Sequence, residues 1–287
     1  MTPSIATQAG GLLRLLRPKQ WIKNAFVIAP LIFAHAFLEP RSIRNTVIAV
    51  LLFCCASSIT YIINDLHDIE KDRLHPTKRL SRPLAAGTVT RAAAFAALVA
   101  LGVVLSLSWL WSAPTAVALF AYLALNLAYT FFLKDQPVAD IFSIAVGFVL
   151  RVYAGAVAIS VPLSSWMAIT TLCLALYLAS IKRRQELATV GTGSRRVLDH
   201  YSAELIDRYA EMSAVGALIF YSLFVMSSSL GLTPTIPVVI FGLFRYWYVV
   251  DKLEGGESPT DVVLSDIPLA LTIVIWGAIC VFALLHR

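Results

Sequence analysis

Residues 43–72 of this chain read IRNTVIAVLLFCCASSITYIINDLHDIEKD. Residues 43–63 are predominantly apolar, and their length matches the ~20 residues that an α-helix needs to cross the hydrocarbon core of a bilayer. An amide and three carboxylates follow at once, at Asn64, Asp65, Asp68 and Asp72. The stretch therefore predicts a membrane-spanning helix with an acidic group at its end.

The whole chain shares this apolar character. Of its 287 residues, 59% are hydrophobic and 14% are charged, and the mean hydropathy is +0.78. Soluble domains contain about 25% charged residues, so the composition excludes an ordinary soluble domain. No linker or change in composition divides the chain, which predicts a single domain over residues 1–287. We expect an all-α integral membrane protein of about nine transmembrane helices. The predicted spans are 22–38, 43–63, 92–110, 114–133, 138–158, 164–181, 212–231, 235–250 and 267–285.

The charged residues predict how the chain lies in the membrane. With the N-terminus in the cytoplasm, 18 of the 23 Lys and Arg residues fall on the cytoplasmic side and three on the other. Short loops rich in Lys and Arg stay in the cytoplasm. Of the 17 Asp and Glu residues, only Glu39 maps to the outer side. We predict a multi-pass protein of the cell (inner) membrane, with the N-terminus and the active site cytoplasmic and the C-terminus outside.

The acidic residues share one face if the helix continues through them. At about 100° per residue, Asp68 lies near 40°, Asp72 near 80° and Asp65 near 100° from Asn64. Like charges this close destabilise an isolated helix, and Mg²⁺ is commonly held by one or two carboxylates together with substrate phosphates and water. The prediction is a Mg²⁺ site at Asn64, Asp68 and Asp72, with Asp65, Asp68 and Asp72 as the catalytic acids. Asp65 either ligates the metal or orients a ligand. The alternative is a solvated acidic helix end that binds nothing.

A basic stretch follows directly and reads RLHPTKRLSRPLAAG at residues 73–87. Lys78 and Arg82 are predicted to bind phosphate, because guanidinium groups bind phosphate through two N–H groups. Membrane topology alone would also place basic residues here. The order Asn-Asp-x-x-Asp-x-x-x-Asp followed by Arg-Pro-Leu-Ala-Ala-Gly resembles the first motif of the UbiA superfamily of intramembrane prenyltransferases. The resemblance spans essentially the whole chain. It implies a nine-helix bundle around a cytoplasm-facing cavity, with a magnesium diphosphate held by two acidic motifs.

The second of those motifs is not acidic in this chain. Residues 180–187 read SIKRRQEL, with cations where prenyl-transferring branches of the superfamily typically have Asp-x-x-x-Asp. One acidic cluster can hold one metal diphosphate, and Lys182 and Arg183 opposite it would suit a second, metal-free phosphate. The pattern resembles the decaprenyl-phosphate phosphoribosyltransferase branch of the superfamily. The stretches that carry this resemblance are residues 16–24, 75–79, 128–134, 150–158, 182–187 and 251–259.

The branch resemblance implies the substrates and the reaction. Phosphoribosyl diphosphate (PRPP) would give its 5-phosphoribose to a polyprenyl (decaprenyl-type) phosphate and release pyrophosphate, with Mg²⁺ as cofactor. A phosphate monoester has a second pKa near ~6, so the lipid nucleophile is already ionised at neutral pH and needs no general base. The chain length of the lipid is the least transferable part of this inference.

Further predicted substrate-binding residues lie outside the two motifs. Lys19 and Lys23 flank Trp21, and the alternative for both is an interfacial anchor. Arg151 falls near the middle of a predicted span. A charge at that depth usually has a function, and the alternative is a buried structural pair. The alternative for Tyr129 is a place in the belt of aromatic side chains at the membrane interface. The full substrate-binding set is Lys19, Lys23, Lys78, Arg82, Tyr129, Lys134, Asp140, Arg151, Lys182 and Arg183.

Two other functions are compatible with parts of the pattern. A UbiA-type prenyltransferase would move a prenyl group from a prenyl diphosphate to an aromatic acceptor, and the missing second acidic motif counts against it. A transporter or channel with an acidic mouth would need ionisable residues across the bilayer, whereas the charges here gather on one side. We expect the two phosphate substrates and the membrane as partners, and no nucleic acid. A homo-oligomer remains open.

Overall fold

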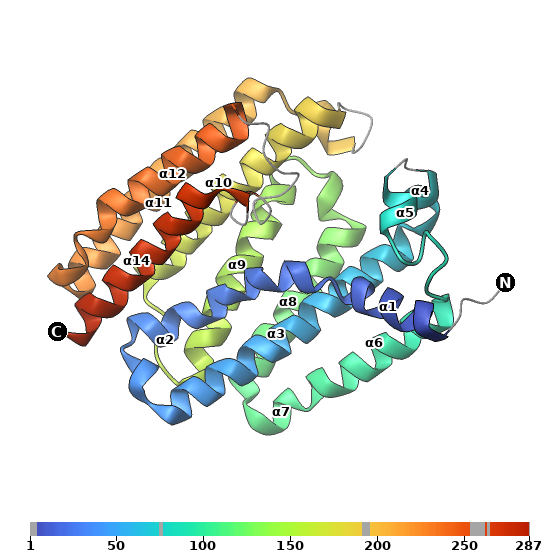
Figure 1. Cartoon of the computed structure of the whole chain (residues 1–287), viewed down its shortest axis with the longest axis horizontal. Coiled ribbons are helices and arrows are strands. Elements are labelled where there is room, and N and C mark those ends of the chain that lie inside the picture. Colours follow the sequence, from blue (N-terminus) through green and yellow to red (C-terminus); the bar gives the residue numbers. More distant parts are fainter. Residues whose placement is uncertain (1–4, 75–76, 191–195, 253–261, 263–264, 287) are drawn as a thin grey trace.

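The computed structural model describes residues 5–74, 77–190, 196–252, 262 and 265–286. Every regular element in this part of the chain is helical. The long helices run side by side in one bundle (Figure 1), with α10, α11, α12 and α14 grouped along one flank. The helices are α1 (Ile5–Leu16), α2 (Ala29–Phe33), α3 (Pro40–His67), α4 (Ile69–Leu74), α5 (Lys78–Ser81), α6 (Arg91–Ser106), α7 (Ser108–Trp111), α8 (Ala113–Phe131), α9 (Ala139–Ala158), α10 (Ser165–Val190), α11 (Ala203–Ser228), α12 (Thr235–Lys252) and α14 (Ile267–Leu285). The 3₁₀ segments are η1 (Pro18–Ile28), η2 (Ala36–Leu38), η3 (Leu133–Asp135), η5 (Arg196–His200) and η6 (Leu230–Leu232).

The spanning helices match the second to the ninth predicted spans. Within the described residues, eight helices are long and apolar enough to cross a membrane: 40–67, 91–111, 113–131, 139–158, 165–188, 203–228, 230–252 and 267–285. The predicted all-α membrane fold of about nine spanning segments is confirmed. The protein is a multi-pass membrane protein.

The first predicted span, residues 22–38, is broken rather than continuous. It consists of η1, α2 and η2 in succession. Pro30 stands at the start of α2, and its ring would collide with the carbonyl of Phe26 in a continuous α-helix. His35 then adopts a left-handed backbone with φ of +60°. The sequence predicted one span over residues 22–38, but it did not predict that the helix is broken into three short pieces.

The bundle core joins the two flanks through α9. α9 packs against both α8 and α10, and α10 packs against α11. One buried cluster joins α3, α8 and α9 around Phe53, Leu119 and Tyr122. Large apolar side chains elsewhere are exposed, such as Phe95, Val99 and Val103 on α6. In a membrane these exposed side chains face lipid.

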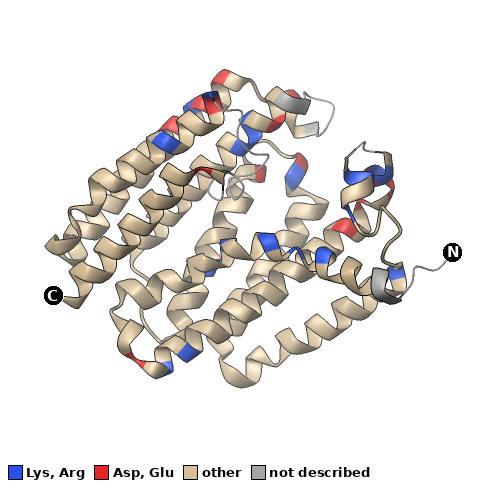
Figure 2. Cartoon of the chain, viewed as in Figure 1, with Lys and Arg blue, Asp and Glu red and all other residues tan. Residues whose placement is uncertain are grey.

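Charged residues gather at one end of the bundle. Figure 2 shows most Lys, Arg, Asp and Glu positions along the upper edge and right side of the view, beyond the apolar middle of the helices. A smaller charged group lies at the opposite end, near the start of α3. The crowded end contains α4, α5 and the C-terminal end of α3, which carry the acidic and basic stretches.

Candidate active site at the charged end of the bundle

Asp65 is the buried centre of the acidic helix end. It lies in the last turn of α3, its side chain is 1% exposed, and its Oδ1 accepts from both Arg17 and Arg82. The Arg82 Nη1–Oδ1 distance is 2.6 Å. Arg17 also stacks over the Tyr61 ring, with its Cζ 4.6 Å from the ring centroid. Asp65 therefore holds two guanidinium groups beside the acidic stretch.

Asp68 and Asp72 lie beyond the end of α3, and each faces a lysine. The Nζ of Lys134 lies 3.3 Å from Asp68 Oδ1, and the Nζ of Lys78 lies 3.9 Å from Asp72 Oδ1. Burial raises the pKa of Asp68, but the contacts with His67 and Lys134 outweigh it, so the pKa stays below its ordinary value of 3.8. At neutral pH the Asp68 carboxylate is ionised and attracts cations.

The donor set fits a magnesium ion that is bound largely through its substrate. Among the described residues, no group of three or more His, Cys, Asp and Glu side chains forms a metal site by itself. Asp65 is directed to its two arginines, which leaves the carboxylates of Asp68 and Asp72 and the amide of Asn64. One or two carboxylates, completed by phosphate oxygens and water, are a common Mg²⁺ environment.

The end of α8 connects the acidic end of α3 to α10. Lys134, in η3 just after α8, reaches Asp68, while the hydroxyl of Tyr129 in the last turns of α8 accepts from Arg183 of α10 at 3.1 Å. Lys182 lies 3.8 Å from Glu186. The structure thus brings Lys78, Arg82, Tyr129, Lys134 and Lys182 to the charged end of the bundle.

Arg183 and Asp140 form a buried pair. Their side chains are 1% and 0% exposed, with Nε and Oδ2 2.6 Å apart. Arg183 also contacts Glu186 at 2.7 Å, and the Tyr201 hydroxyl donates to the second oxygen of Asp140 at 2.7 Å. Burial raises the pKa of Tyr201, so its hydroxyl is protonated and able to donate. Two carboxylates already compensate the charge of Arg183, which was predicted to bind phosphate directly.

Arg151 lies inside the bundle, and every partner that the described residues give it is neutral. It donates to Asn24 Oδ1 at 2.9 Å, to the Gly147 carbonyl at 2.8 Å and to the Tyr122 hydroxyl at 2.9 Å. Its guanidinium lies 4.7 Å from the centroid of the Tyr122 ring and 5.1 Å from that of Phe148. Arg151 therefore joins η1, α8 and α9.

Lys19 and Lys23 lie on different faces of η1. A 3₁₀ helix repeats every three residues, so Trp21, Asn24 and Val27 form one row. This row packs on α3 and α9: Trp21 donates to Ser58, Asn24 bonds to Ser57 and Arg151, and Val27 is fully buried. Lys23 lies half-buried in a second row with Phe26, which packs on Phe148 of α9. Lys19 belongs to the third row, which is exposed.

Arg17, Asn24 and Tyr201 each contact a predicted site residue but were absent from the predicted site. Arg17 and Asn24 fall within the matching stretch 16–24, which was the available signal for both. Tyr201 had no local signal, because its partners Val138 and Asp140 are more than 60 residues away in the sequence. Parts of two matching stretches, residues 75–76 and 253–259, lie outside the described residues.

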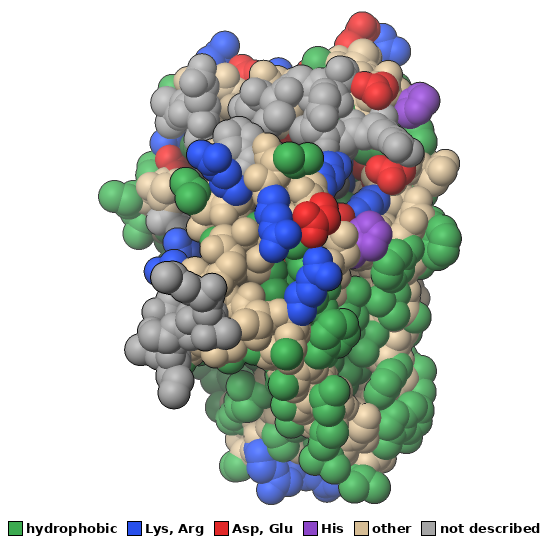
Figure 3. Space-filling view, turned by 90° about the vertical axis from the view of Figure 1, so that its right-hand side faces the viewer, with side chains coloured by type: hydrophobic (Ala, Val, Ile, Leu, Met, Phe, Trp, Pro, Cys, Tyr) green, Lys and Arg blue, Asp and Glu red, His purple; other side chains and the backbone are tan. Residues whose placement is uncertain are grey.

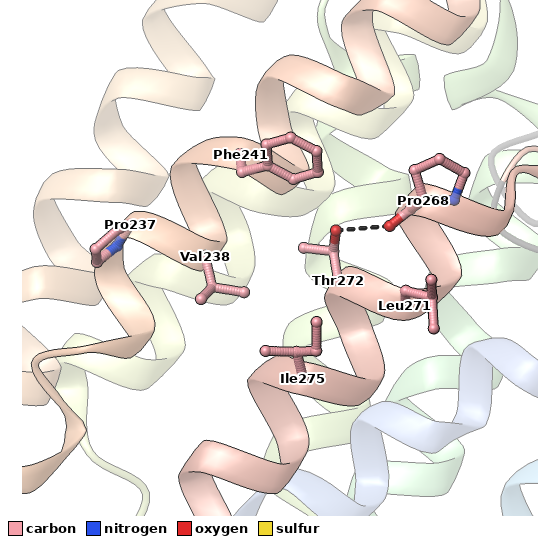
Figure 4. Close-up of a pocket in the computed structure, with 7 residues that line it drawn as sticks. All are labelled: Pro237, Val238, Phe241, Pro268, Leu271, Thr272 and Ile275. Carbon is pink, nitrogen blue, oxygen red and sulfur yellow. Dashed lines mark hydrogen bonds between the residues drawn. The ribbon is translucent and has the colours of Figure 1, made fainter.

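The surface at this end is strongly charged. Figure 3 shows basic, acidic and histidine side chains together in the upper half of one face, above a lower half that is mainly hydrophobic. A separate groove of about 420 Å³ lies between α12 and α14 and is lined by apolar side chains such as Phe241, Leu271 and Ile275 (Figure 4). None of the predicted site residues lies on those two helices.

Comparison with known proteins agrees with this geometry. The family model described as the UbiA prenyltransferase family matches residues 25–260. The chain belongs to the UbiA prenyltransferase family. This confirms the resemblance drawn from the acidic and basic motifs, and it makes the protein a membrane transferase.

Relatives of known name match most of the chain. The chain is 37% identical over 284 residues to the decaprenyl-phosphate phosphoribosyltransferase of Corynebacterium glutamicum, across 93% of this chain and 85% of that one. It is 33% identical over 293 residues to the protein of the same name from Mycobacterium tuberculosis, across 97% and 95% of the two chains. The predicted resemblance to this branch is therefore confirmed.

A solved structure shares the fold. A UbiA homolog from Archaeoglobus fulgidus bound to DMAPP and Mg²⁺ superimposes with a TM-score of 0.71, over 96% of this chain and 99% of that chain. The sequence identity is 19%, so this likeness concerns the fold.

Proposed function

We propose that this UbiA-family protein transfers 5-phosphoribose from PRPP to a polyprenyl (decaprenyl-type) phosphate and releases pyrophosphate, with Mg²⁺. One observation carries the proposal: an acidic helix end at Asp68 and Asp72 shares the charged end of the bundle with a stretch of α10 at residues 182–184 that has cations in place of a second acidic motif. The only nearby carboxylate in the motif of α10, Glu186, is bound by Arg183 and Lys182. This arrangement favours one metal diphosphate and one metal-free phosphate. The names of the relatives support it.

In the proposed reaction, the phosphate oxygen of the lipid forms a bond to the anomeric carbon of the ribose. The bond from that carbon to the diphosphate breaks, and pyrophosphate leaves with the electron pair. A bound Mg²⁺ would act as a Lewis acid on the departing diphosphate. Asn64, Asp68 and Asp72 would hold the ion, and Lys78 and Arg82 would neutralise the remaining oxygens. Because the acceptor is ionised, the protein's main task is alignment of the two substrates.

The other predicted substrate-binding residues differ in how directly their contacts support a role in the site. Lys134 contacts Asp68 and Lys23 lies on a half-buried face of η1, and we propose that both meet a phosphate. Tyr129, Asp140 and Arg183 bond to one another or to Tyr201, and we propose that they shape the site wall. Arg151 acts in this proposal by fixing η1.

We further propose that the charged end faces the cytoplasm, with the N-terminus inside and the C-terminus outside. The excess of Lys and Arg at that end supports this orientation. A reporter enzyme that is active only outside the cytoplasm, fused after Arg287, should be active. Activity of a cytoplasm-only reporter at the same position would overturn the orientation.

The experiment that tests the function uses purified protein in detergent with Mg²⁺. One mixture contains labelled PRPP and polyprenyl phosphate, and the second contains a labelled prenyl diphosphate and an aromatic acid. We expect label to enter the lipid phase in the first mixture and no labelled product in the second. Transfer in the second mixture alone would establish the alternative, a prenyltransferase. The second mixture is included because a homolog bound to DMAPP shares this fold.

A further inference from the structure

The turn between α8 and α9 has a strained backbone at Val138. Its φ and ψ are +67° and −47°, and the N–H of Ala139 donates to the carbonyl of Pro137 at 2.8 Å. These values describe a three-residue γ-turn with positive φ at its centre, which is a rare and strained conformation. Positive φ at a β-branched residue is an outlier, and such strain persists only where the surroundings hold it. The turn therefore needs a restraint.

Tyr201 provides that restraint from a distant part of the chain. Its hydroxyl accepts the N–H of Val138 at 2.6 Å and donates to Asp140 Oδ1 at 2.7 Å. The Tyr201 side chain is buried in a cluster with Val197, Leu198 and Ile206. This packing fixes the position of the hydroxyl, so one oxygen atom ties both the turn and the first turn of α9 to the segment before α11.

The restrained turn carries Lys134. Lys134 lies four residues before Val138, and its ammonium group is 3.3 Å from Asp68 Oδ1. Asp140, two residues after Val138, is held by Arg183 through its other oxygen. Movement of the turn would therefore change the distance between Lys134 and the acidic end of α3 while leaving α3 itself in place.

We propose that Tyr201 is a positioning residue: its hydroxyl holds the γ-turn at Val138 and thereby sets Lys134 against Asp68, where the magnesium diphosphate binds. This inference rests on the proposed function, because that function is what brings a magnesium diphosphate to Asp68. Tyr201 touches the turn and Asp140, and it acts on the diphosphate through Lys134.

The test compares Tyr201→Phe with Tyr246→Phe in the full-length protein. Tyr246 is the matched control because it is equally buried and its hydroxyl has no hydrogen-bond partner among the described residues. The readout is the affinity for magnesium pyrophosphate by calorimetry, together with KM for PRPP and kcat. Loss of a charge-assisted contact predicts about tenfold weaker binding and a higher KM for Tyr201→Phe, and less than about a twofold change for Tyr246→Phe.

A double-mutant cycle separates positioning from a general loss of structure. In a Lys134→Ala background, Tyr201→Phe should have little further effect on magnesium pyrophosphate affinity, because the residue through which it acts is gone. Wild-type affinity in Tyr201→Phe, or an equal loss with and without Lys134, would overturn the proposal. Failure of the wild-type to transfer phosphoribose would overturn the proposed function alone, since pyrophosphate binding is measured independently.

A second variant covers the case in which Tyr201→Phe does not fold. Glycine adopts positive φ freely, so Val138→Gly removes the strain that the hydroxyl holds. With the strain relieved, Val138→Gly should also help Tyr201→Phe to fold, and in this background Tyr201→Phe should weaken magnesium pyrophosphate binding less than it does in the wild-type chain, because the turn needs less restraint. An equal loss of affinity in the two backgrounds would contradict the proposal.

Discussion

At the scale of single residues, Asp65 illustrates how a buried carboxylate can serve a site indirectly. One of its oxygens binds both Arg17 and Arg82, and the other has no hydrogen-bond partner within the described part of the chain. A buried charge must be paired to be tolerated. The sequence left open whether Asp65 ligates the metal or orients a ligand, and its contacts favour a role in orienting Arg17 and Arg82, of which Arg82 is proposed to bind the diphosphate.

Replacing Asp65 by Asn tests this role. Asn keeps the shape and removes the charge, so Arg17 and Arg82 lose their common anionic partner and the proposed contact of Arg82 with the diphosphate loses its support. We expect the initial rate of phosphoribosyl transfer to fall by about 10–100-fold. The control is Glu70→Gln, because Glu70 is exposed and pairs only with Arg73 and Arg91 among the described residues. Equal rates in both variants and the wild-type would remove Asp65 from the site.

The pH dependence should report the substrates rather than the metal site. The pKa of Asp68 is held below 3.8, so this carboxylate stays ionised as the pH falls from 8 to 5. The phosphate monoesters have a second pKa near ~6, and protonation removes the nucleophilic charge of the acceptor. The transfer rate, measured across this range, should fall with a midpoint near ~6. A transfer rate that stays constant between pH 8 and pH 5 would contradict this account.

At the scale of elements, η1 shows what a hydrophobicity pattern cannot predict. Residues 22–38 are apolar enough to read as one span, but Pro30 breaks the α-helix and a 3₁₀ period takes over before it. This period places Lys19 and Lys23 on different faces, whereas the sequence treated them alike. The exposed face of Lys19 supports the interfacial-anchor alternative for this residue, and the half-buried face of Lys23 supports a role in the site.

Alanine substitutions should separate the two lysines. Lys23→Ala removes a cation next to the interior wall formed by α9, so we expect KM for PRPP or for the lipid phosphate to rise by about tenfold. Lys19→Ala should change either KM by less than about twofold. Steady-state kinetics in detergent measure both. A larger effect at Lys19 than at Lys23 would contradict the arrangement of rows on η1.

The contact between η1 and α9 also depends on one glycine. A Cβ added at Gly155 would overlap the carbonyl of Val27, whereas a Cβ added at Gly102 of α6 would meet no atom within 4 Å. Gly155→Ala should therefore force η1 away from α9 and lower stability by about 1–3 kcal/mol. Gly102→Ala should leave stability unchanged or slightly higher. Thermal unfolding in detergent compares them, and equal midpoints would show that the two segments do not pack this closely.

At the scale of the whole molecule, the sequence predicted the helical membrane fold, the spans from residue 43 onward and the clustering of charge. Composition and helical period suffice for these, because each is a property of one segment. They did not predict the Arg17–Asp65 or Tyr201–Asp140 contacts, which join residues 48 and 61 positions apart. Helical period predicted one continuous face from Asn64 to Asp72, whereas α3 ends at His67 and α4 begins at Ile69. It also did not predict that Asp65 pairs with two arginines. The single domain over residues 1–287 and the oligomeric state stay predictions.

The measurement that tests the central claim most directly is phosphoribosyl transfer by the double variant Asp68→Asn, Asp72→Asn as Mg²⁺ is varied. Asn keeps both side chains in place and removes the charges that would hold the metal diphosphate at the end of α3. The account predicts that transfer falls by at least about 100-fold and that much higher Mg²⁺ is needed for the remaining activity. Wild-type rates with an unchanged Mg²⁺ dependence would contradict it.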